Sequence, residues 1–345
     1  MKITGARVAV TGGAGFIGSH LVDRLAGLGN QVLVVDDFST GDRDNLVLQA
    51  SNPAVTVAEL DIRDEGALMD AFRGIDFVFH MACRNVRLSL RRPTEVHEVN
   101  ATGTLNTLKA ACAAGVRRYL YCSSSEVNGT ADVVPMPEDY HFKPETIYGA
   151  SKLTGEYYTQ VFQRAGWLET VIVRPHNNYG PREHYEGISG EVIPRFILQA
   201  LAGLPLTVYG DGSQTRDFTY VAETADFLVR LLECDKAVGG TFTLCHGDEV
   251  SIRDIATLIL EVTGSGAKPS FLPGRPSDVL RLYGDISRLR ELLGEAPSVS
   301  IKEGLARTVD WFRRNVELTP EVVESVSTAA SWVNFPGEDW LPEKR

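Results

Sequence analysis

Cysteine is scarce in this chain, and its few cysteines have no spacing typical of a metal site or a disulfide framework. There are five cysteines among 345 residues, and no two of them form a Cys-x-x-Cys pair. They stand in apolar surroundings, which predicts reduced core residues, no bound metal and, by default, a cytoplasmic location. The five are Cys83, Cys112, Cys122, Cys234 and Cys245.

An excess of basic residues is also missing. The chain has 34 Lys and Arg against 45 Asp and Glu, a formal net charge of −11. Nonspecific binding to nucleic acid or to an anionic membrane needs a basic surface, so we expect neither partner. A phosphorylated ligand is compatible with this charge, because a few local arginines suffice to bind it.

Long apolar runs are absent as well. No stretch of about 18 apolar residues occurs, so we expect no membrane-spanning helix. The N-terminal run MKITGARVAV leads directly into a strand candidate and shows no cleavage site, so we expect no secretory signal. A chain of 345 residues is long enough for one large domain or two smaller ones.

The first 175 residues do contain a regular alternation of strand-like and helix-like segments. The strand-like segments cover residues 7–11, 31–36, 55–59, 77–80, 118–122 and 170–174. The helix-like segments cover residues 17–27, 65–72, 93–114 and 147–163. This alternation predicts an α/β fold with a Rossmann-type, doubly wound parallel sheet over residues 1–175.

Glycine and proline become frequent after Pro175, which indicates loops that reach over a site. We expect a smaller, mixed α/β substrate-binding region over residues 176–345, with some segments returning to the sheet. Its expected helices cover 192–202, 222–232, 252–262 and 301–314, and its expected strands cover 206–209 and 241–244. The acidic tail after Thr319 has no clear periodicity, and we expect it to wrap the surface.

A glycine turn follows the first strand candidate in the run VAVTGGAGFIG. Gly12 permits a tight turn with positive φ, Gly15 lets the backbone approach a pyrophosphate, and Gly18 lets the helix pack close to the strand. The helix then starts with N–H groups that point at the phosphates. The second strand candidate ends at Asp36, where a carboxylate would bind the adenosine ribose hydroxyls. The pattern predicts a dinucleotide site.

Polar and small residues also follow the carboxyl ends of the other strand candidates, where ligands bind in such folds. Asp36 and Asp37 would both repel a 2′-phosphate, so we expect NAD rather than NADP. Besides the glycines and Asp36, the residues expected at the cofactor are Phe16, Ile17, Asp37, Ser39, Thr40, Gly41, Asp61, Ile62, Met81, Ala82, Ser123, Tyr148, Lys152 and Pro175.

Tyr148 and Lys152 stand four residues apart in IYGASK, at the start of a predicted helix, so their side chains share one face. A free phenol has a pKa near 10, which is too high for an effective base at neutral pH. The lysine ammonium and the positive nicotinamide ring would lower the pKa of Tyr148. The tyrosinate could then deprotonate a substrate hydroxyl that Ser124 aligns.

These pieces resemble the extended short-chain dehydrogenase/reductases of the nucleotide-sugar epimerase and dehydratase group. The matching motifs run over residues 7 to about 290: TGGAGFIGSH, VVDDFSTG, LDIRD, VNATGTLN, SSSEV, YGASK, RPHNNYGPR, GDGSQTRDF and GRPSDV. The resemblance implies a tightly held NAD, a nucleotide-diphosphate sugar substrate that is oxidised at C4 and usually reduced again, and a homodimer. Helices 93–114 and 147–163 would then form a four-helix bundle across the two-fold axis.

The resemblance also implies roles for particular residues. Ser124, Tyr148 and Lys152 match the catalytic triad, and Asn100 matches the asparagine that supports the lysine region at the cofactor. The expected substrate-binding residues are Ser124, Glu126, Asn177, Arg195, Arg216 and Arg275, with Asp278 near the nucleotide ribose. Arg216 and Arg275 match arginines that hold the diphosphate, for which a bidentate guanidinium is suited.

Glu126 is the residue on which we expect the reaction to depend. A 4,6-dehydratase must remove the C5 proton and eject the C6 hydroxyl, and a carboxylate near the triad serine could do so. The order Ser124-Ser125-Glu126 resembles the Thr-Ser-Glu of GDP-mannose dehydratases and UDP-glucuronate decarboxylases, so Ser125 and Glu126 join the expected catalytic residues. A 4,6-dehydratase-like reaction is therefore the leading hypothesis.

Three alternatives stay open. The chain could be a 4-epimerase, including one for a uronic acid, with a structural Glu126. It could be a UDP-glucuronate decarboxylase, although YGASK stands where those enzymes usually carry YDEAK. It could also be a noncatalytic NAD-binding module. Two arginines after the fourth strand candidate, Arg84 and Arg87, are expected near the sugar and would suit a carboxylated or further-phosphorylated substrate.

Overall fold

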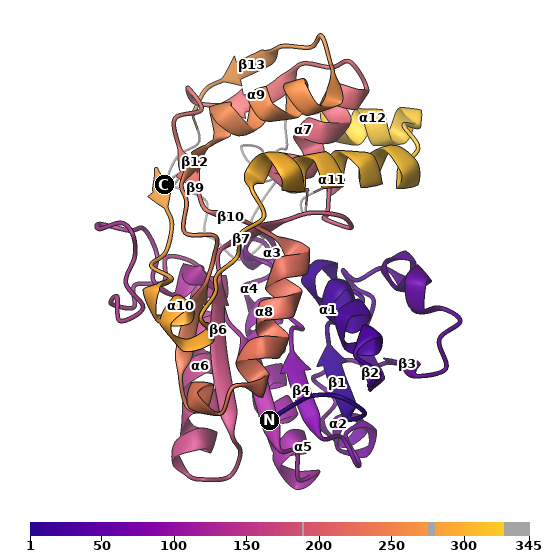
Figure 1. Ribbon diagram of the computed structural model, residues 1–345, viewed down its shortest axis with the longest axis vertical. Coiled ribbons are helices and arrows are strands. Elements are labelled where there is room, and N and C mark those ends of the chain that lie inside the picture. The colour runs from indigo at the N-terminus through magenta and orange to yellow at the C-terminus, as the bar shows by residue number, and fades with distance from the viewer. Residues whose placement is uncertain (188–189, 275–279, 328–345) are drawn as a thin grey trace, which may run out of the picture.

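The computed structural model describes residues 1–187, 190–274 and 280–327. Its centre is a seven-stranded sheet in the order β11-β6-β5-β4-β1-β2-β3, and every neighbouring pair is parallel (Figure 1). The strands are β1 (Arg7–Thr11), β2 (Gln31–Asp36), β3 (Val55–Glu59), β4 (Phe77–His80), β5 (Arg118–Cys122), β6 (Thr170–Pro175) and β11 (Thr241–Leu244). The predicted Rossmann-type α/β fold is confirmed.

Helices cover both faces of this sheet, which explains why its central strands are apolar almost throughout. Val8 and Val10 of β1 pack with α1 (Phe16–Gly27) and α8 (Val221–Glu233). Ala9 points to the opposite face, as the two-residue period of a strand requires. That face is covered by α2 (Glu65–Ala71), α5 (Thr104–Ala113) and α6 (Ile147–Arg164).

The helix expected over residues 93–114 is not one regular α-helix. It begins as α4 (Pro93–His97), widens into the π-helical turn η2 (Glu98–Gly103) and continues as α5. The wide turn leaves the carbonyl of Asn100 to accept a hydrogen bond from the Thr104 hydroxyl at 2.6 Å. Wide turns of this kind are frequent at functional sites, and this one lies beside the cavity described below.

A second group of elements forms the upper half of the molecule in Figure 1. Its helices are α7 (Val192–Leu201), α9 (Ile252–Thr263), α11 (Ile301–Asn315) and α12 (Pro320–Ser327), and its parallel strand pair is β8 (Leu206–Tyr209) with β13 (Pro269–Leu272). They share a core that includes Phe196, Ile255 and Phe312. The tail after Thr319, expected to wrap the surface, begins with α12, whose Val326 is instead buried in that core.

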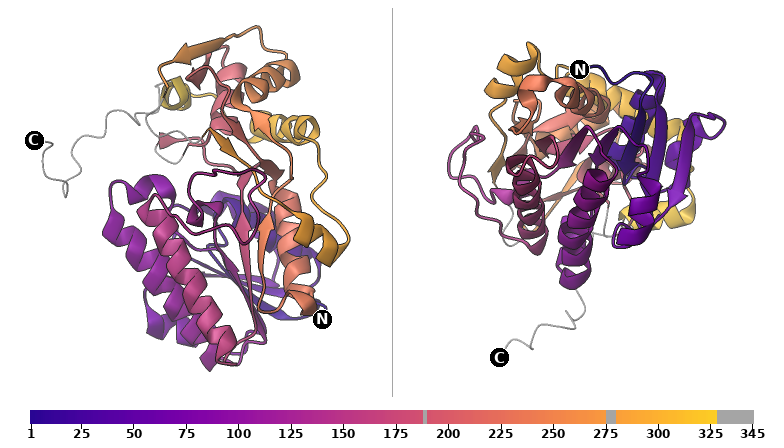
Figure 2. Two further views of the ribbon diagram at one scale, coloured as in Figure 1. Left: turned by 90° about the vertical axis from the view of Figure 1, so that its left-hand side faces the viewer. Right: turned by 90° about the horizontal axis from the view of Figure 1, so that it is seen from below.

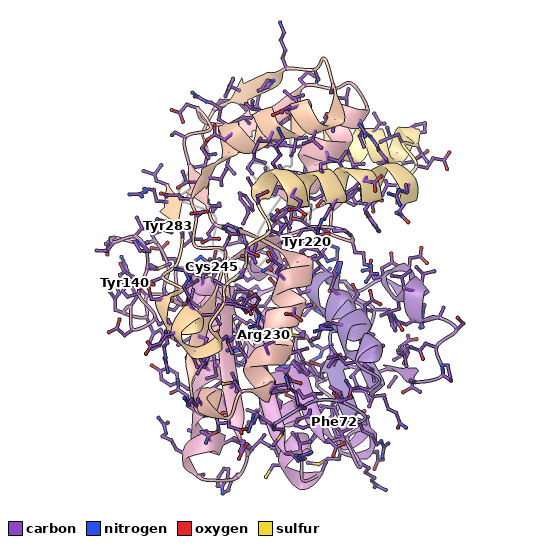
Figure 3. The ribbon with its side chains drawn as sticks, viewed as in Figure 1. Phe72, Tyr140, Tyr220, Arg230, Cys245 and Tyr283 are labelled. Atoms are coloured by element: carbon purple, nitrogen blue, oxygen red, sulfur yellow. The ribbon has the colours of Figure 1, made fainter. Side chains whose placement is uncertain are left out.

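Short elements join the two halves. They are β7 (Asn177–Tyr179) paired with β10 (Phe218–Tyr220), and β9 (Thr215–Arg216) between β12 (Val250–Ser251) and β14 (Arg281–Leu282). Tyr220, at the end of β10, lies where the halves meet (Figure 3). The chain then returns to the lower half through α8, β11 and α10 (Ser287–Leu293), so segments after residue 175 do complete the sheet and its cover. The domain boundary at residue 175 stays a prediction.

The remaining elements are short helices: η1 (Arg43–Gln49), α3 (Val86–Ser89), η3 (Ser125–Val127) and η5 (Asp235–Ala237). No helix in the described part of the chain combines the length and the apolarity needed to cross a bilayer. The described residues also contain no cluster of His, Cys, Asp and Glu arranged to hold a metal ion.

Candidate active site

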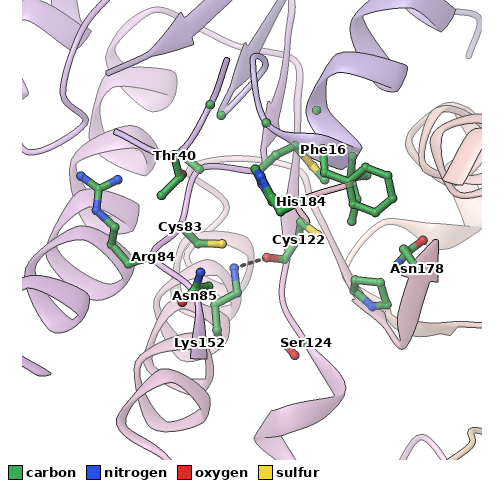
Figure 4. Close-up of a pocket in the computed structure, with 18 of the residues that line it drawn as sticks. Phe16, Thr40, Cys83, Arg84, Asn85, Cys122, Ser124, Lys152, Asn178 and His184 are labelled. Carbon is green, nitrogen blue, oxygen red and sulfur yellow. Dashed lines mark hydrogen bonds between the residues drawn. The ribbon is translucent and has the colours of Figure 1, made fainter. Parts of the chain in front are cut away.

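A cavity of about 360 Å³ opens at the carboxyl ends of β1, β2, β4, β5 and β6 (Figure 4). Because parallel strands end at one edge of the sheet, side chains far apart in the sequence meet there. The expected site residues that line it are Gly12, Gly15, Phe16, Ile17, Gly18, Asp36, Asp37, Thr40, Gly41, Ile62, Met81, Ala82, Arg84, Ser123, Ser124, Tyr148, Lys152, Pro175 and Asn177.

The glycine turn between β1 and α1 has no room for side chains. Gly12 has a φ of +67°, and a Cβ there would lie 2.7 Å from the Ala82 backbone. A Cβ on Gly18 would lie 2.0 Å from the carbonyl oxygen of Gly12, so α1 can pack this closely only with glycine. The turn therefore leaves its backbone open to a ligand at the start of α1, as a pyrophosphate requires.

Tyr148 and Lys152 stand on the first turns of α6, which Thr146 caps by accepting a hydrogen bond from the backbone N–H of Gly149. The buried Lys152 ammonium donates a 2.5 Å hydrogen bond to the carbonyl oxygen of Cys122 at the end of β5, drawn as the dashed line in Figure 4. Ser124 follows two residues later and lies close enough to the Tyr148 phenol to lower its pKa. The predicted Ser-Tyr-Lys set is thus assembled in one wall of the cavity.

Burial dominates the electrostatics of this set. It raises the pKa of Tyr148, the field of Cys83 raises it further, and Lys152 and Ser124 lower it. Lysine therefore acts in the expected direction, but it does not outweigh burial in the chain alone. Although burial by itself would lower the pKa of Lys152, the fields of Cys83 and Tyr148 raise it. Lys152 accordingly stays an ammonium, and a further positive charge beside Tyr148 is needed to make the phenol a base.

Asn100 does not line the cavity formed by the described residues. It hydrogen-bonds groups next to residues that do line it. Its side-chain amide donates to the Ser151 hydroxyl at 3.1 Å, and Ser151 in turn donates to the Tyr148 carbonyl at 2.7 Å. The same side chain exchanges two hydrogen bonds with the backbone of Arg84. Asn100 thus ties the loop after β4 to the first turn of α6, and its role of supporting the lysine region stays a prediction.

Glu126 lies beside the Ser-Tyr-Lys set, outside the cavity lining that the described residues define. Its backbone N–H donates to the Ser124 hydroxyl at 3.2 Å, and its carbonyl packs on Gly149. Burial raises the pKa of the Glu126 carboxyl, while the positive charge of Arg216 lowers it. The guanidinium expected to hold the diphosphate therefore acts on the charge of this carboxyl. Ser125 is buried and does not line the described cavity either.

The arginines expected at the substrate have protein partners. Arg84 turns away from the triad in Figure 4 and pairs with Asp37 and Glu95. Arg87 makes two 2.7 Å hydrogen bonds to Glu191. In neither case does the structure favour the expected contact with the sugar, because a carboxylate of the protein already faces the guanidinium.

Arg195 is buried and donates to the Val326 carbonyl of α12 at 3.4 Å, which ties it to the upper core. The Arg216 guanidinium donates to the Thr215 carbonyl at 2.7 Å. Neither residue is among those that line the described cavity. Arg275 and Asp278 lie outside the described residues.

Two expected cofactor residues also lie outside the cavity lining that the structure describes. The Ser39 hydroxyl donates to the Asp37 carboxylate at 2.6 Å. Asp61 forms an ion pair with Arg63. Both were expected because they follow strand ends, but their side chains bind protein groups.

Several residues that sequence reasoning did not assign to the site line the cavity. The most polar are His176, Asn178, Glu183, His184 and Glu191, from the segment after β6. Burial raises the pKa of Glu183 well above its usual range, which favours the neutral form of that carboxyl. The density of polar residues in RPHNNYGPREH, directly after a strand end, was the signal that could have identified them.

The cavity suits a dinucleotide by its chemistry as well as its shape. Ser123 Oγ, His176 Nδ1 and Asn177 Oδ1 are buried and have no hydrogen-bond partner within the described protein. Such groups normally bind a ligand or water. All three residues line the cavity, as does the glycine turn that offers phosphate-binding N–H groups. The residues present therefore fit a bound dinucleotide.

The fold and this site define an extended short-chain dehydrogenase/reductase. The model of the NAD dependent epimerase/dehydratase family matches residues 8–245. The chain belongs to that family, whose members modify nucleotide sugars, and NAD is its cofactor. The expected family and cofactor are confirmed.

Relatives of known activity differ in the reaction they catalyse. UDP-glucuronic acid decarboxylase 2 of Arabidopsis thaliana is 37% identical over 322 residues, 92% of this chain and 70% of the relative. A UDP-glucose 4-epimerase structure from Thermotoga maritima with UDP-glucose has a TM-score of 0.83 at 33% identity, covering 90% of this chain and 100% of that one. A dTDP-glucose 4,6-dehydratase structure from Streptomyces venezuelae with NAD has a TM-score of 0.84 at 31% identity, covering 92% and 99%.

Proposed function

We propose that the protein oxidises a nucleotide-diphosphate sugar at C4 and then eliminates water across C5 and C6, as a 4,6-dehydratase does. The observation that carries this proposal is the half-buried Glu126, whose backbone N–H donates to Ser124 and whose carboxyl lies within the field of Arg216. Neither the Ser-Tyr-Lys set nor the cofactor supplies a base for C5. We assign that step to Glu126.

In this proposal Tyr148 takes the proton of the C4 hydroxyl, and Ser124 orients that hydroxyl. NAD, when bound, supplies the acceptor and later the donor of the hydride. Lys152 keeps its positive charge at the end of β5 and stabilises the tyrosinate. The triad alone thus accounts for reversible oxidation of the sugar, which every branch of the family shares.

The C4 ketone acidifies the C5 proton, which Glu126 can then remove. The C5–C6 double bond forms as the C6–O bond breaks, and the same carboxyl returns the proton to the departing hydroxyl, so that water leaves. The hydride taken from C4 would then return to C6 and a solvent proton would add at C5, which restores the oxidised cofactor. Proton transfer is most effective when the pKa of the base lies near the working pH. Burial moves the pKa of Glu126 upward from its ordinary value, toward that range.

Replacing Glu126 with Gln tests the proposal. We expect kcat for release of dehydrated product to fall about 10²- to 10⁴-fold, the usual contribution of a positioned proton-transfer group. Reduction of bound NAD on mixing with the sugar should persist, because C4 oxidation does not use Glu126. Mass spectrometry of the product and absorbance of the reduced cofactor measure the two steps. Glu291→Gln, an exposed carboxylate in α10, is the matched control.

Full dehydratase activity in Glu126→Gln would exclude the elimination role. A wild-type product of unchanged mass, from a panel of nucleotide sugars that includes uronic acids, would point to 4-epimerisation. That alternative is favoured by the position of Glu126 outside the described cavity lining.

Decarboxylation is the second candidate function, favoured by the relative from Arabidopsis. A 4-keto uronic acid loses carbon dioxide readily and then needs a proton at C5. A carboxyl whose pKa is raised by burial can donate it, so Glu126 would act as an acid instead of a base. Loss of carbon dioxide rather than water in the same mass spectrum distinguishes the two.

For the substrate we propose a UDP-sugar, because the epimerase from Thermotoga maritima was solved with UDP-glucose. Arg216 is proposed to hold the diphosphate, together with Arg275 and with Asp278 at the ribose. Asn177, whose buried side-chain oxygen has no partner in the described protein, is proposed to contact the sugar or its phosphates.

We also propose that two copies associate through α5 and α6, which lie side by side on one flank (Figure 2). Tyr157 and Val161 are one turn apart on α6 and are 47% and 44% exposed, so they present an apolar pair on the surface of this helix. Placing a charge in that face should separate a dimer, because a buried unpaired carboxylate is costly. We expect Tyr157→Asp to elute at half the wild-type mass in light scattering, whereas Trp167→Asp would not. A wild-type monomer would contradict this proposal.

A further inference from the structure

The side chain of Arg84 extends toward the end of β2, on the side of the cavity expected to hold the cofactor, and not toward the Ser-Tyr-Lys set. Arg84 follows β4, yet its guanidinium hydrogen-bonds Asp37 Oδ2, which follows β2, at 2.8 Å. Strand β1 lies between those two strands in the sheet, so the side chain spans the edge above β1. The guanidinium is thereby placed at the end of β2, where the adenosine ribose of a dinucleotide binds in this fold.

The position of Arg84 is fixed by several contacts. Its side chain is only 7% exposed, and its Nε donates to Glu95 Oε1 at 3.0 Å. Its backbone is clamped by the side chain of Asn100, which accepts from the N–H at 2.7 Å and donates to the carbonyl at 3.1 Å. A guanidinium held this firmly loses little further entropy when it binds a ligand.

The two acids at the carboxyl end of β2, Asp36 and Asp37, have different roles. Asp36 is buried, and its two carboxylate oxygens accept hydrogen bonds from the backbone N–H groups of Ala14 and Phe38, both at 2.9 Å. Asp36 therefore holds the glycine turn against the end of β2. Asp37 is more exposed, lines the cavity and pairs with Arg84. Asp37 is thus the acid whose charge acts directly on Arg84.

We propose that Asp37 and Arg84 together determine the choice between NAD and NADP. Asp37 repels a 2′-phosphate and also occupies the guanidinium that would otherwise bind one. When the charge of Asp37 is removed, Arg84 becomes a ligand for the 2′-phosphate. The chain thus carries a complete phosphate-binding arginine that its own carboxylate holds in an NAD-selective arrangement. This inference does not depend on which sugar reaction the enzyme catalyses.

The chemistry of the guanidinium supports this role. A planar guanidinium binds phosphate oxygens through charge-assisted hydrogen bonds, as it binds the carboxylate of Asp37 now. The nearby Glu95 would still orient it, because that contact uses Nε, whereas the bond to Asp37 uses Nη2. A substitution that frees Nη2 therefore leaves the side chain held in place.

The test compares the wild type with Asp37→Asn, Arg84→Met and the double variant. The affinity ratio is obtained by displacing NAD from the holoprotein with NADP. A hydrogen bond to a charged group corresponds to about 1.5–3 kcal/mol, so we expect Asp37→Asn to shift this ratio toward NADP by about 10- to 150-fold. Arg84→Met alone should still favour NAD, because Asp37 remains. In the double variant most of the shift should be lost.

Two outcomes would overturn the proposal. If Asp37→Asn does not improve NADP binding, Arg84 is only a brace between loops. If the double variant keeps the full shift, repulsion by Asp37 explains the selectivity and Arg84 is not a ligand. Asp44→Asn, an exposed acid in η1, is the control for loss of charge alone. If Asp37→Asn does not fold, Asp37→Ser with ³¹P NMR of bound 2′,5′-ADP reports the same contact directly.

Discussion

Replacing Tyr148 with phenylalanine should lower kcat by about 10²- to 10⁴-fold, because it removes the proton acceptor for the C4 hydroxyl. The ring keeps its place on the first turn of α6, which Thr146 caps, so packing should hardly change. NAD should stay bound, since the glycine turn and Asp36 are untouched. Stopped-flow measurement of NAD reduction on mixing with the sugar checks the step directly.

The effect of pH distinguishes a catalytic tyrosine from a structural one. Burial raises the pKa of the Tyr148 phenol in the chain alone, whereas Lys152 lowers it. Removing the ammonium in Lys152→Met should therefore move the rising limb of the wild-type pH profile to higher pH. Tyr157→Phe, an exposed tyrosine on the same helix, is the control and should leave the NAD reduction rate unchanged. A Tyr148→Phe enzyme that reduces NAD at the wild-type rate would remove the phenol from the mechanism.

Local sequence patterns predicted the sheet well, because its strands obey rules that are visible in short stretches. The first five strand candidates have the bounds seen in the structure. The sixth strand, β6, extends one residue beyond the predicted end, to Pro175. These strands are apolar and end at polar or glycine-rich turns. Strands β9, β12 and β14, which help to join the two halves, were not predicted. Each has only two residues and is stabilised by pairing with segments that are distant in the sequence.

The break in the helix over residues 93–114 could not be predicted from periodicity. The π-helical turn depends on tertiary partners: Thr104 donates to the Asn100 carbonyl and bonds the ring of His80 on β4 at 2.9 Å. His80 is fully buried, and its other ring nitrogen bonds the Thr11 hydroxyl at 2.7 Å. Burial lowers its pKa to about 3, so the ring stays neutral and can accept on one side and donate on the other.

The site was predicted best where the backbone geometry restricts which residue types can occupy a position. The glycine turn and the Ser-Tyr-Lys set follow from spacing, and they meet in one cavity. The contacts of the arginines were predicted less well, because the sequence shows where a charged residue stands but not which residue it pairs with. Arg84 and Arg87 look alike in CRNVRLSL, yet one pairs with Asp37 and the other with Glu191. Those carboxylates stand far from them in sequence, so only the fold reveals which guanidinium faces which acid.

The largest expected effect on stability comes from the buried ion pair between Glu156 and Arg174. The pair joins α6 to β6 through two hydrogen bonds, Nε to Oε1 at 2.8 Å and Nη2 to Oε2 at 2.7 Å. The two side chains are 1% and 5% exposed. Arg174→Met should lower the free energy of unfolding by about 3–5 kcal/mol, because it leaves the carboxylate buried without a counter-charge. Chemical denaturation at a fixed, saturating NAD concentration measures the change.

The double variant Glu156→Leu/Arg174→Met tests whether the pair itself stabilises the fold. Desolvation of two buried charges offsets most of their attraction, so an apolar pair of similar volume should recover most of the loss. Arg73→Met is the matched control, since its ion pair with Asp70 is 80% and 71% exposed and should contribute at most about 1 kcal/mol. A double variant as unstable as Arg174→Met would instead mean that the bidentate geometry holds α6, and with it Tyr148 and Lys152, against the sheet.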